Sequence, residues 1–187
     1  MDATKSKYVI TDSDMLHGKL AAIAIWAGED PACYRKVGNY GSYLLAEPTE
    51  RLLNSTIARL HFEDASGMSH FRLIYESPNL VDYTEKVKIF EYVTGAIIRV
   101  RIEPQEQVGV LLNMTSNQCR NFQYINKCVA ADGGYEIRVP YPTDNKYETH
   151  AIGLYSLFAI NNSSPMMKNV EVDENDIING NIIDVIL

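Results

Sequence analysis

Residues 98–103 read Ile-Arg-Val-Arg-Ile-Glu, an alternation of apolar and charged side chains that is typical of a β-strand with one buried and one solvated face. The same period of two recurs through the second half of the chain. Further strands are predicted at 87–92, 108–114, 122–129, 135–139 and 155–160. Asp132-Gly133-Gly134 and Asn179-Gly180 carry the residues of hairpin turns. Many short strands separated by turns predict an all-β sandwich or barrel-like module.

Upstream of residues 83–86 the apolar side chains follow a helical period instead. A first helix is predicted over 11–27, because the Thr11 hydroxyl can accept from the free amides of the first turn and Gly28 can end the helix. A second helix, with its apolar side chains at helical spacing, is predicted over 48–61. Its first residue is either Pro48 or Thr49.

Two shorter features complete the first half of the chain. Proline and glycine residues predict an irregular connection at 30–41, and the apolar run at 71–76 predicts a short strand. The predicted fold class is therefore α+β. A mainly helical N-terminal subdomain with a short strand element is expected at 1–85, followed by the all-β module at 86–187.

Composition excludes several classes of protein. With 187 residues, of which 46% are hydrophobic and 22% charged, the chain has the composition of a globular protein. No apolar run approaches the ~20 residues of a membrane helix, and the polar N-terminus does not have the apolar core of a signal peptide. A net charge of −7 argues against nucleic acid or an anionic membrane as the main partner.

The predicted first helix places two opposite charges within its apolar face. At about 100° per residue, Asp12 and Lys19 fall among Met15, Ile23 and Trp26. Because helical side chains lean toward the N-terminus, the Lys19 ammonium is expected to approach Asp12. Two interpretations remain open. Either this face borders a polar partner, or Asp12 favours the helix dipole while Lys19 extends its charge into water.

The spacing Asp12-x-x-Met15-x-x-x-Lys19-x-x-x-Ile23 resembles the Asp-Lys-Ile variant of a signature helix. That helix belongs to the catalytic subunit of archaeal oligosaccharyltransferase, the AglB family. Three further segments, at 57–62, 71–77 and 87–96, resemble parts of the same family in the family's own order. The resemblance therefore spans most of the chain.

The resemblance implies an enzyme that transfers an oligosaccharide from a dolichol-phosphate-type lipid carrier to the Asn of an Asn-x-Ser/Thr acceptor, at the extracytoplasmic face of the membrane. In that family the catalytic carboxylates and a divalent metal, Mn or Mg, lie in an N-terminal membrane region. A Trp-Trp-Asp motif recognises the hydroxyl residue of the acceptor, with the signature helix beside it. By carry-over, Asp12, Met15, Lys19 and Ile23 are expected to line the acceptor pocket.

This sequence departs from the family in two respects. It contains no Trp-Trp-Asp-Tyr-Gly motif, since Trp26 is its one tryptophan, and it has no membrane region. We therefore expect a soluble, monomeric piece of a longer chain that starts after that motif. Such a piece is expected to bind no metal and to have no transferase activity alone.

The three cysteines form an odd set, which fits either reduced thiols or one bridge with a free thiol left over. Cys119 and Cys128 bracket Phe122-Gln123-Tyr124-Ile125 and could face each other across a sheet. The extracytoplasmic side that the resemblance implies favours a disulfide between these two residues.

The remaining polar residues give no catalytic pattern. The histidines, at positions 17, 61, 70 and 150, lack close metal-ligand spacing, and no metal site is predicted. Residues 173–176, Asp-Glu-Asn-Asp, lack the EF-hand spacing and are interpreted as a solvated acidic turn. The alternative to the transferase is a cell-surface binding or structural protein, whose β half is an immunoglobulin-like or carbohydrate-binding module. A free-standing soluble enzyme ranks last, because no catalytic constellation is present.

Overall fold

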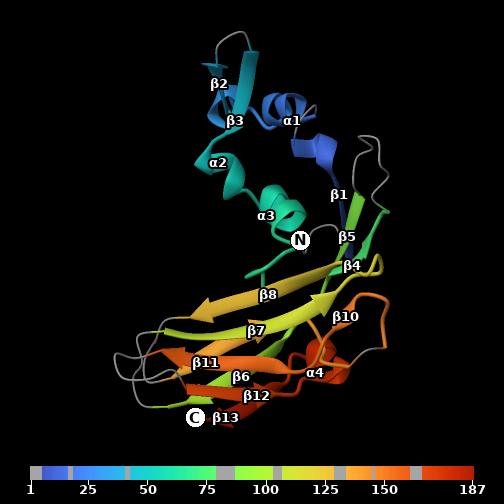
Figure 1. The fold of residues 1–187 in the computed structure, drawn as a ribbon, viewed down its shortest axis with the longest axis vertical. Helices are drawn as coiled ribbons and strands as arrows, with labels where there is room; N and C mark the ends of the chain where they lie inside the picture. The colour runs from blue at the N-terminus through green and yellow to red at the C-terminus, as the bar shows by residue number, and fades with distance from the viewer. Residues whose placement is uncertain are drawn as a thin grey trace.

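Strands are the most abundant element of the computed structural model, which describes residues 6–16, 19–40, 43–78, 87–102, 107–128, 134–144, 146–160 and 166–187 (Figure 1). The second half forms the strands that stack in the lower part of Figure 1. The described residues of the first half form three short α-helices, a hairpin and two strands above them.

The β module is built on two sheets that share one core. The larger sheet centres on β7 (Gln107–Thr115), which pairs with β8 (Asn121–Cys128), β10 (His150–Ala151) and β11 (Tyr155–Ile160), while β12 (Met166–Val170) pairs with β11. The smaller sheet has the order β13 (Ile182–Ile186), β6 (Ala96–Arg101), β9 (Tyr135–Val139). Apolar side chains of both sheets are buried in one cluster, as in a sandwich. The predicted alternation is confirmed, since Ile98 and Val100 are buried and Arg101 is exposed.

A third sheet joins the two halves of the sequence. It has the order β1 (Tyr8–Asp12), β5 (Val87–Tyr92), β4 (Phe71–Glu76), and both pairings are antiparallel. Its central strand therefore follows the predicted division at residue 86, whereas the two outer strands precede it. The division of the chain into 1–85 and 86–187 stays a prediction.

The prediction of a mainly helical N-terminal subdomain is wrong. Residues 8–12 form β1, a 3-10 helix, η1 (Ser13–Leu16), follows, and α1 (Leu20–Trp26) is only seven residues long. The Thr11 hydroxyl does not cap a helix, because it lies 2.9 Å from Nδ1 of His61 in a buried hydrogen bond. β-branched residues at 9–11 also favour a strand once β5 is available as a partner.

Residues 30–41 are not irregular as predicted. They contain a short 3-10 helix, η2 (Pro31–Cys33), and β2 (Arg35–Tyr40), which forms an antiparallel hairpin with β3 (Tyr43–Pro48). The predicted second helix is present in two pieces, α2 (Glu50–Leu53) and α3 (Thr56–Phe62). The break occurs because Ser55 acts as a second N-cap and accepts from the amide of Ala58.

The C-terminal region contains a helix that the sequence interpretation missed. Asp173 and Asp176 form a capping box at the start of α4 (Glu174–Asn179), so the predicted acidic turn is wrong. Gly180, with φ of 68°, ends this helix in the left-handed conformation, and Asn179-Gly180 is therefore not a hairpin turn. The chain then runs into β13, which lies parallel to β6. The predicted turn at Asp132-Gly133 lies outside the described residues.

The predicted disulfide between Cys119 and Cys128 is wrong, because all three cysteines are free thiols. Cys119 lies in the turn before β8 and Cys128 is the last residue of that strand. β8 lies between the two cysteines, and its eight extended residues span roughly 24 Å from the first to the last, at about 3.4 Å per step. A disulfide needs Cα atoms about 4.4–6.8 Å apart.

Candidate functional site

The Asp12–Lys19 pair forms at the end of β1. The Lys19 Nζ atom lies 3.1 Å from Oδ2 of Asp12 and 3.3 Å from Oδ2 of Asp14. The other oxygen of Asp12, Oδ1, accepts from the amide of Met15 at 2.8 Å. The expected approach of Lys19 to Asp12 is therefore confirmed, although a strand end and a 3-10 helix bring the residues together. The Lys19 side chain is 50% exposed, so the pair is open to a partner.

Ile23 lies one helical turn beyond Lys19. Its amide donates to the Lys19 carbonyl at 3.0 Å. The buried side of α1 is formed by Leu20 and Ala24, whereas Ile23 is 42% exposed and Trp26 is 91% exposed. The structure therefore presents an apolar surface beside the charged pair, rather than burying Ile23 in the core.

Electrostatics keep both partners charged. Burial alone would raise the pKa of the Asp12 carboxyl, but hydrogen bonds from Lys19 and from the Met15 amide outweigh it, and the pKa of Asp12 is lowered. The hydrogen bond to Asp12, followed by that to Asp14, raises the pKa of Lys19. Two carboxylates and one ammonium give this group a formal charge of −1 at neutral pH, and its ammonium lies between the two carboxylates.

A buried polar network lies directly behind the pair. The imidazole of His61, on α3, holds Thr11, the residue before Asp12. The carbonyl of His61 accepts from Lys88 Nζ at 2.5 Å, and that ammonium also contacts Oδ1 of Asp64 at 2.6 Å. Both side chains of the Lys88–Asp64 pair are more than nine-tenths buried.

Arg120 extends this network into the β module. It lies in the turn between β7 and β8, donates to both oxygens of Asp64 at 2.8 and 2.9 Å, and contacts Glu76 of β4 at 2.8 Å. The Glu76 carboxylate also accepts from the Ser116 hydroxyl at 2.7 Å. The strand that carries Asp12 is thus tied to the sandwich through charged groups. Asp64 and Arg120 are 56 positions apart, and no local sequence pattern links them.

The described residues contain no group of three or more His, Cys, Asp or Glu side chains that could hold a metal ion. None of the helices in the described part of the chain has the length and apolarity to cross a membrane. The site is therefore a surface of paired charges and apolar side chains, which suits binding and orientation of a partner.

Comparison with known proteins shows a similarity to one described protein family. Residues 95–183 match the family described as the archaeal glycosylation protein B long peripheral domain. The match lies within the β module, which is thus similar to the peripheral domain of that family. Over these residues the chain is similar to the AglB family.

Similarity extends beyond that module. Over 95% of its length the chain is 26% identical to dolichyl-phosphooligosaccharide-protein glycotransferase 3 of Archaeoglobus fulgidus, and it covers 30% of that relative. The chain therefore spans about a third of the length of the relatives it matches.

Three solved structures of the Archaeoglobus fulgidus oligosaccharyltransferase share the fold. One is a complex with an inhibitory peptide and a dolichol-phosphate, and it has a TM-score of 0.87 and 22% identity to this chain. The match covers all of this chain and 31% of the solved chain. A second, tethered to an acceptor peptide with the NVT sequon, has a TM-score of 0.85 and 24% identity, covering all of this chain and 32% of its own. The third, with Zn and sulfate, has a TM-score of 0.86 and 23% identity, covering 97% of this chain and 33% of its own.

Proposed function

We propose that this chain works within an oligosaccharyltransferase, which transfers an oligosaccharide from a dolichol-phosphate-type lipid carrier to the Asn of an Asn-x-Ser/Thr acceptor. The name of the curated relative and the ligands of the solved structures support this proposal. The similarity covers 95% of the chain rather than its β half alone, which favours the transferase over a free-standing cell-surface binding module.

Within that enzyme, Asp12, Met15, Lys19 and Ile23 are proposed to border the acceptor sequon. The observation that carries this proposal is the half-exposed Lys19 ammonium held between two carboxylates, one helical turn from an exposed isoleucine. A threonine of the acceptor presents a methyl and a hydroxyl together. Ile23 or Met15 can contact the methyl, which contributes about 0.8 kcal/mol for one carbon. The Asp12–Lys19 pair can orient polar groups near the acceptor.

The catalytic step belongs to other parts of the enzyme in this proposal. A divalent metal, Mn or Mg, and the lipid-linked oligosaccharide are proposed to bind outside this chain, and a solved relative contains Zn. The chain is proposed to lie on the extracytoplasmic side as a monomer, without transferase activity of its own.

Glycan transfer to an Asn-x-Thr peptide, measured in a full-length transferase that carries this chain, tests the acceptor site. Lys19→Ala is expected to raise the KM for the peptide and to leave the melting temperature unchanged. Lys127→Ala, which removes an exposed lysine of β8, serves as the matched control. An unchanged KM in Lys19→Ala would show that the pair only packs the helix. Transfer by the purified 187-residue chain alone would contradict the expected inactivity.

A further inference from the structure

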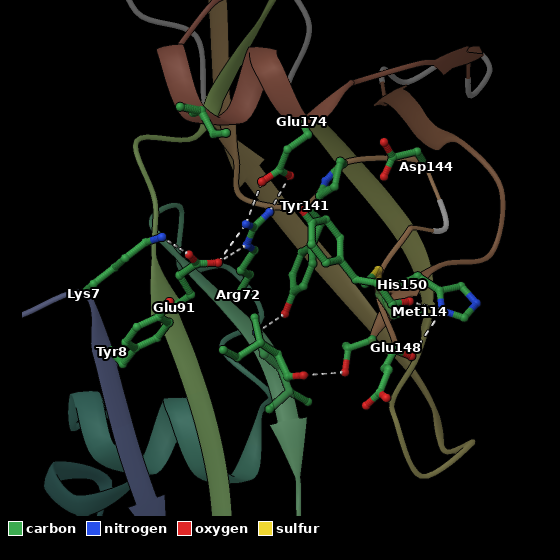
Figure 2. Close-up of a pocket in the computed structure, with 16 residues that line it drawn as sticks. Lys7, Tyr8, Arg72, Glu91, Met114, Tyr141, Asp144, Glu148, His150 and Glu174 are labelled. Atoms are coloured by element: carbon green, nitrogen blue, oxygen red, sulfur yellow. Dashed lines mark hydrogen bonds and ion pairs between the residues drawn. The ribbon is translucent and has the colours of Figure 1, made fainter.

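A cavity of about 540 Å³ lies where the three-stranded sheet meets the sandwich and α4 (Figure 2). Lys7 and Tyr8 line it at the start of β1, whereas Asp12 lies at the end of the same strand. The cavity is therefore separated from the Asp12–Lys19 pair by the length of β1, about 14 Å for four residue steps. Its lining combines buried apolar side chains, tyrosines and charged groups.

The cations in the lining are already paired with carboxylates. Arg72 donates through Nε to Glu91 at 2.8 Å and through both terminal nitrogens to Glu174 at 2.7 and 2.8 Å. Lys7 Nζ lies 2.7 Å from the other oxygen of Glu91. Figure 2 shows this chain of interactions along one wall of the cavity. Two cations and two carboxylates thus neutralise each other, and this wall carries no net charge that would attract an anion.

The opposite wall offers acceptors instead. Oδ1 of Asp144 is shielded from solvent, and no described residue donates a hydrogen bond to it. Lys146, a highly exposed side chain, forms an ion pair with the other oxygen of Asp144 at 2.7 Å. Glu148 adds a second carboxylate to the same wall. Nδ1 of His150 lies 2.8 Å from the Tyr147 carbonyl and must donate to it, so the free nitrogen of the neutral ring is also an acceptor.

We propose that this cavity binds a lysine or arginine side chain of a polypeptide. Its lining holds four carboxylates and two cations, and Lys146, which is outside the lining, pairs with Asp144, so that one negative charge remains in excess. A shielded acceptor without a donor is costly to bury, and an ammonium or guanidinium supplies several donors at once. The apolar lining, which includes Leu73, Met114 and Tyr141, suits the methylene stem that precedes such a charge.

Titration of the 187-residue chain with blocked glycine peptides that carry one central residue tests the proposal. The lysine and arginine peptides are expected to bind, with NMR shifts at Tyr147 and His150, and to bind less tightly as salt is added. The norleucine peptide has an apolar stem without the charge and is expected to bind at least about tenfold more weakly, since a charge-assisted hydrogen bond is lost. The glutamate peptide is expected not to bind.

Charge-neutralising variants locate the binding. Asp144→Asn combined with Glu148→Gln is expected to weaken lysine-peptide binding by about tenfold to a hundredfold. Glu136→Gln combined with Asp184→Asn removes the same number of exposed carboxylates from the smaller sheet and is expected to leave binding unchanged. Thermal unfolding shows whether each double variant retains the fold.

Equal binding of the lysine and norleucine peptides would overturn the proposal, as would tighter binding of a neutral disaccharide such as maltose. Absence of binding by the lysine peptide, or full binding by the Asp144→Asn and Glu148→Gln variant, would overturn it as well. The measurement involves no glycan transfer. A negative result in the peptide titration therefore does not contradict the proposed acceptor function. A negative result in the transfer assay likewise does not contradict peptide binding by this cavity.

Discussion

The ammonium of Lys88 lies 2.6 Å from Oδ1 of Asp64, and both side chains are buried between α3 and the three-stranded sheet. Arg120 reaches the same carboxylate from the sandwich, and Glu76 completes the group. The Arg120 side chain is 32% exposed, whereas the charges of Lys88, Asp64 and Glu76 are buried. Their burial is tolerated because each has an opposite partner at hydrogen-bonding distance. The network therefore fixes how the strand that ends at Asp12 is held against the β module.

Lys88→Met is expected to lower the free energy of unfolding by about 3 kcal/mol or more, because it removes one partner of a buried ion pair and the hydrogen bond that Lys88 donates to the carbonyl of His61. Urea unfolding measures the change. Lys127→Met, at an exposed position of β8, is the matched control and is expected to change stability by less than about 0.5 kcal/mol. A similar loss in both variants would show that the apolar substitution, and not the buried pair, is responsible.

Acidification is expected to destabilise the protein through Glu91. Burial alone would raise the pKa of this carboxyl, but hydrogen bonds from Lys7 and Arg72 outweigh it, and its pKa in the folded protein lies below the ordinary value of 4.5. A lowered pKa means that the stabilisation is complete above pH 4.5 and is lost as pH falls through the folded value. Unfolding free energies measured from pH 6 downward should therefore fall below about pH 4.5.

Glu91→Gln tests this assignment, since the variant is expected to show a flatter loss of stability in that acidic range. Glu136→Gln, which alters an exposed pair with Arg99, is expected to keep the parent slope. An identical pH dependence in Glu91→Gln and the parent chain would assign the acid sensitivity to other carboxylates.

The period-two pattern predicted strands well because it follows directly from burial of one face. The bounds predicted for β5, β9 and β11 agree with the structure. Short sequence patterns gave wrong predictions where one pattern is compatible with two local conformations. Asn179-Gly180 fits a hairpin turn and a helix C-cap equally, and the choice depends on whether α4 precedes it. Thr11 fits an N-cap and a strand equally, and the hydrogen bond with His61 decides between them.

The candidate site was predictable only in part for the same reason. The approach of Lys19 to Asp12 follows from their spacing and from the direction of a lysine side chain. The supporting network could not be predicted, because Asp64, Lys88 and Arg120 come together only when three separate elements pack. Long-range ion pairs of this kind leave no periodic trace in the sequence.

All three cysteines are expected to be reduced. A thiol titration of the denatured protein should therefore count three reactive thiols per chain, with or without prior reductant. In the folded protein, burial raises the pKa of Cys128, and its thiolate fraction at neutral pH is lowered. Cys33 is exposed and is therefore expected to react with a thiol reagent before Cys128. A count that is two equivalents lower without reductant would instead show one disulfide. Cys119→Ser would then test whether that disulfide is the Cys119–Cys128 bridge.

Gly109 allows the Phe158 ring to lie across β7. A Cβ atom at this position would meet Cζ of Phe158, would approach Cε2 to 2.8 Å, and would lie 3.0 Å from the Asn126 carbonyl oxygen. Gly109→Ala is therefore expected to lower the free energy of unfolding by about 1–3 kcal/mol through overpacking. Gly134→Ala is the matched control, because its Cβ meets nothing within 4 Å, and it is expected to be neutral or slightly stabilising.

The two substitutions separate packing from backbone effects, since both replace glycine by alanine in strand regions of the same module. Phe158→Leu shortens the side chain opposite Gly109, and in that background the additional cost of Gly109→Ala should shrink. Urea unfolding of the four chains of this double-mutant cycle gives the coupling between the two positions. A cost that is the same in both backgrounds would place the strain at the Asn126 carbonyl, because that contact does not depend on the ring.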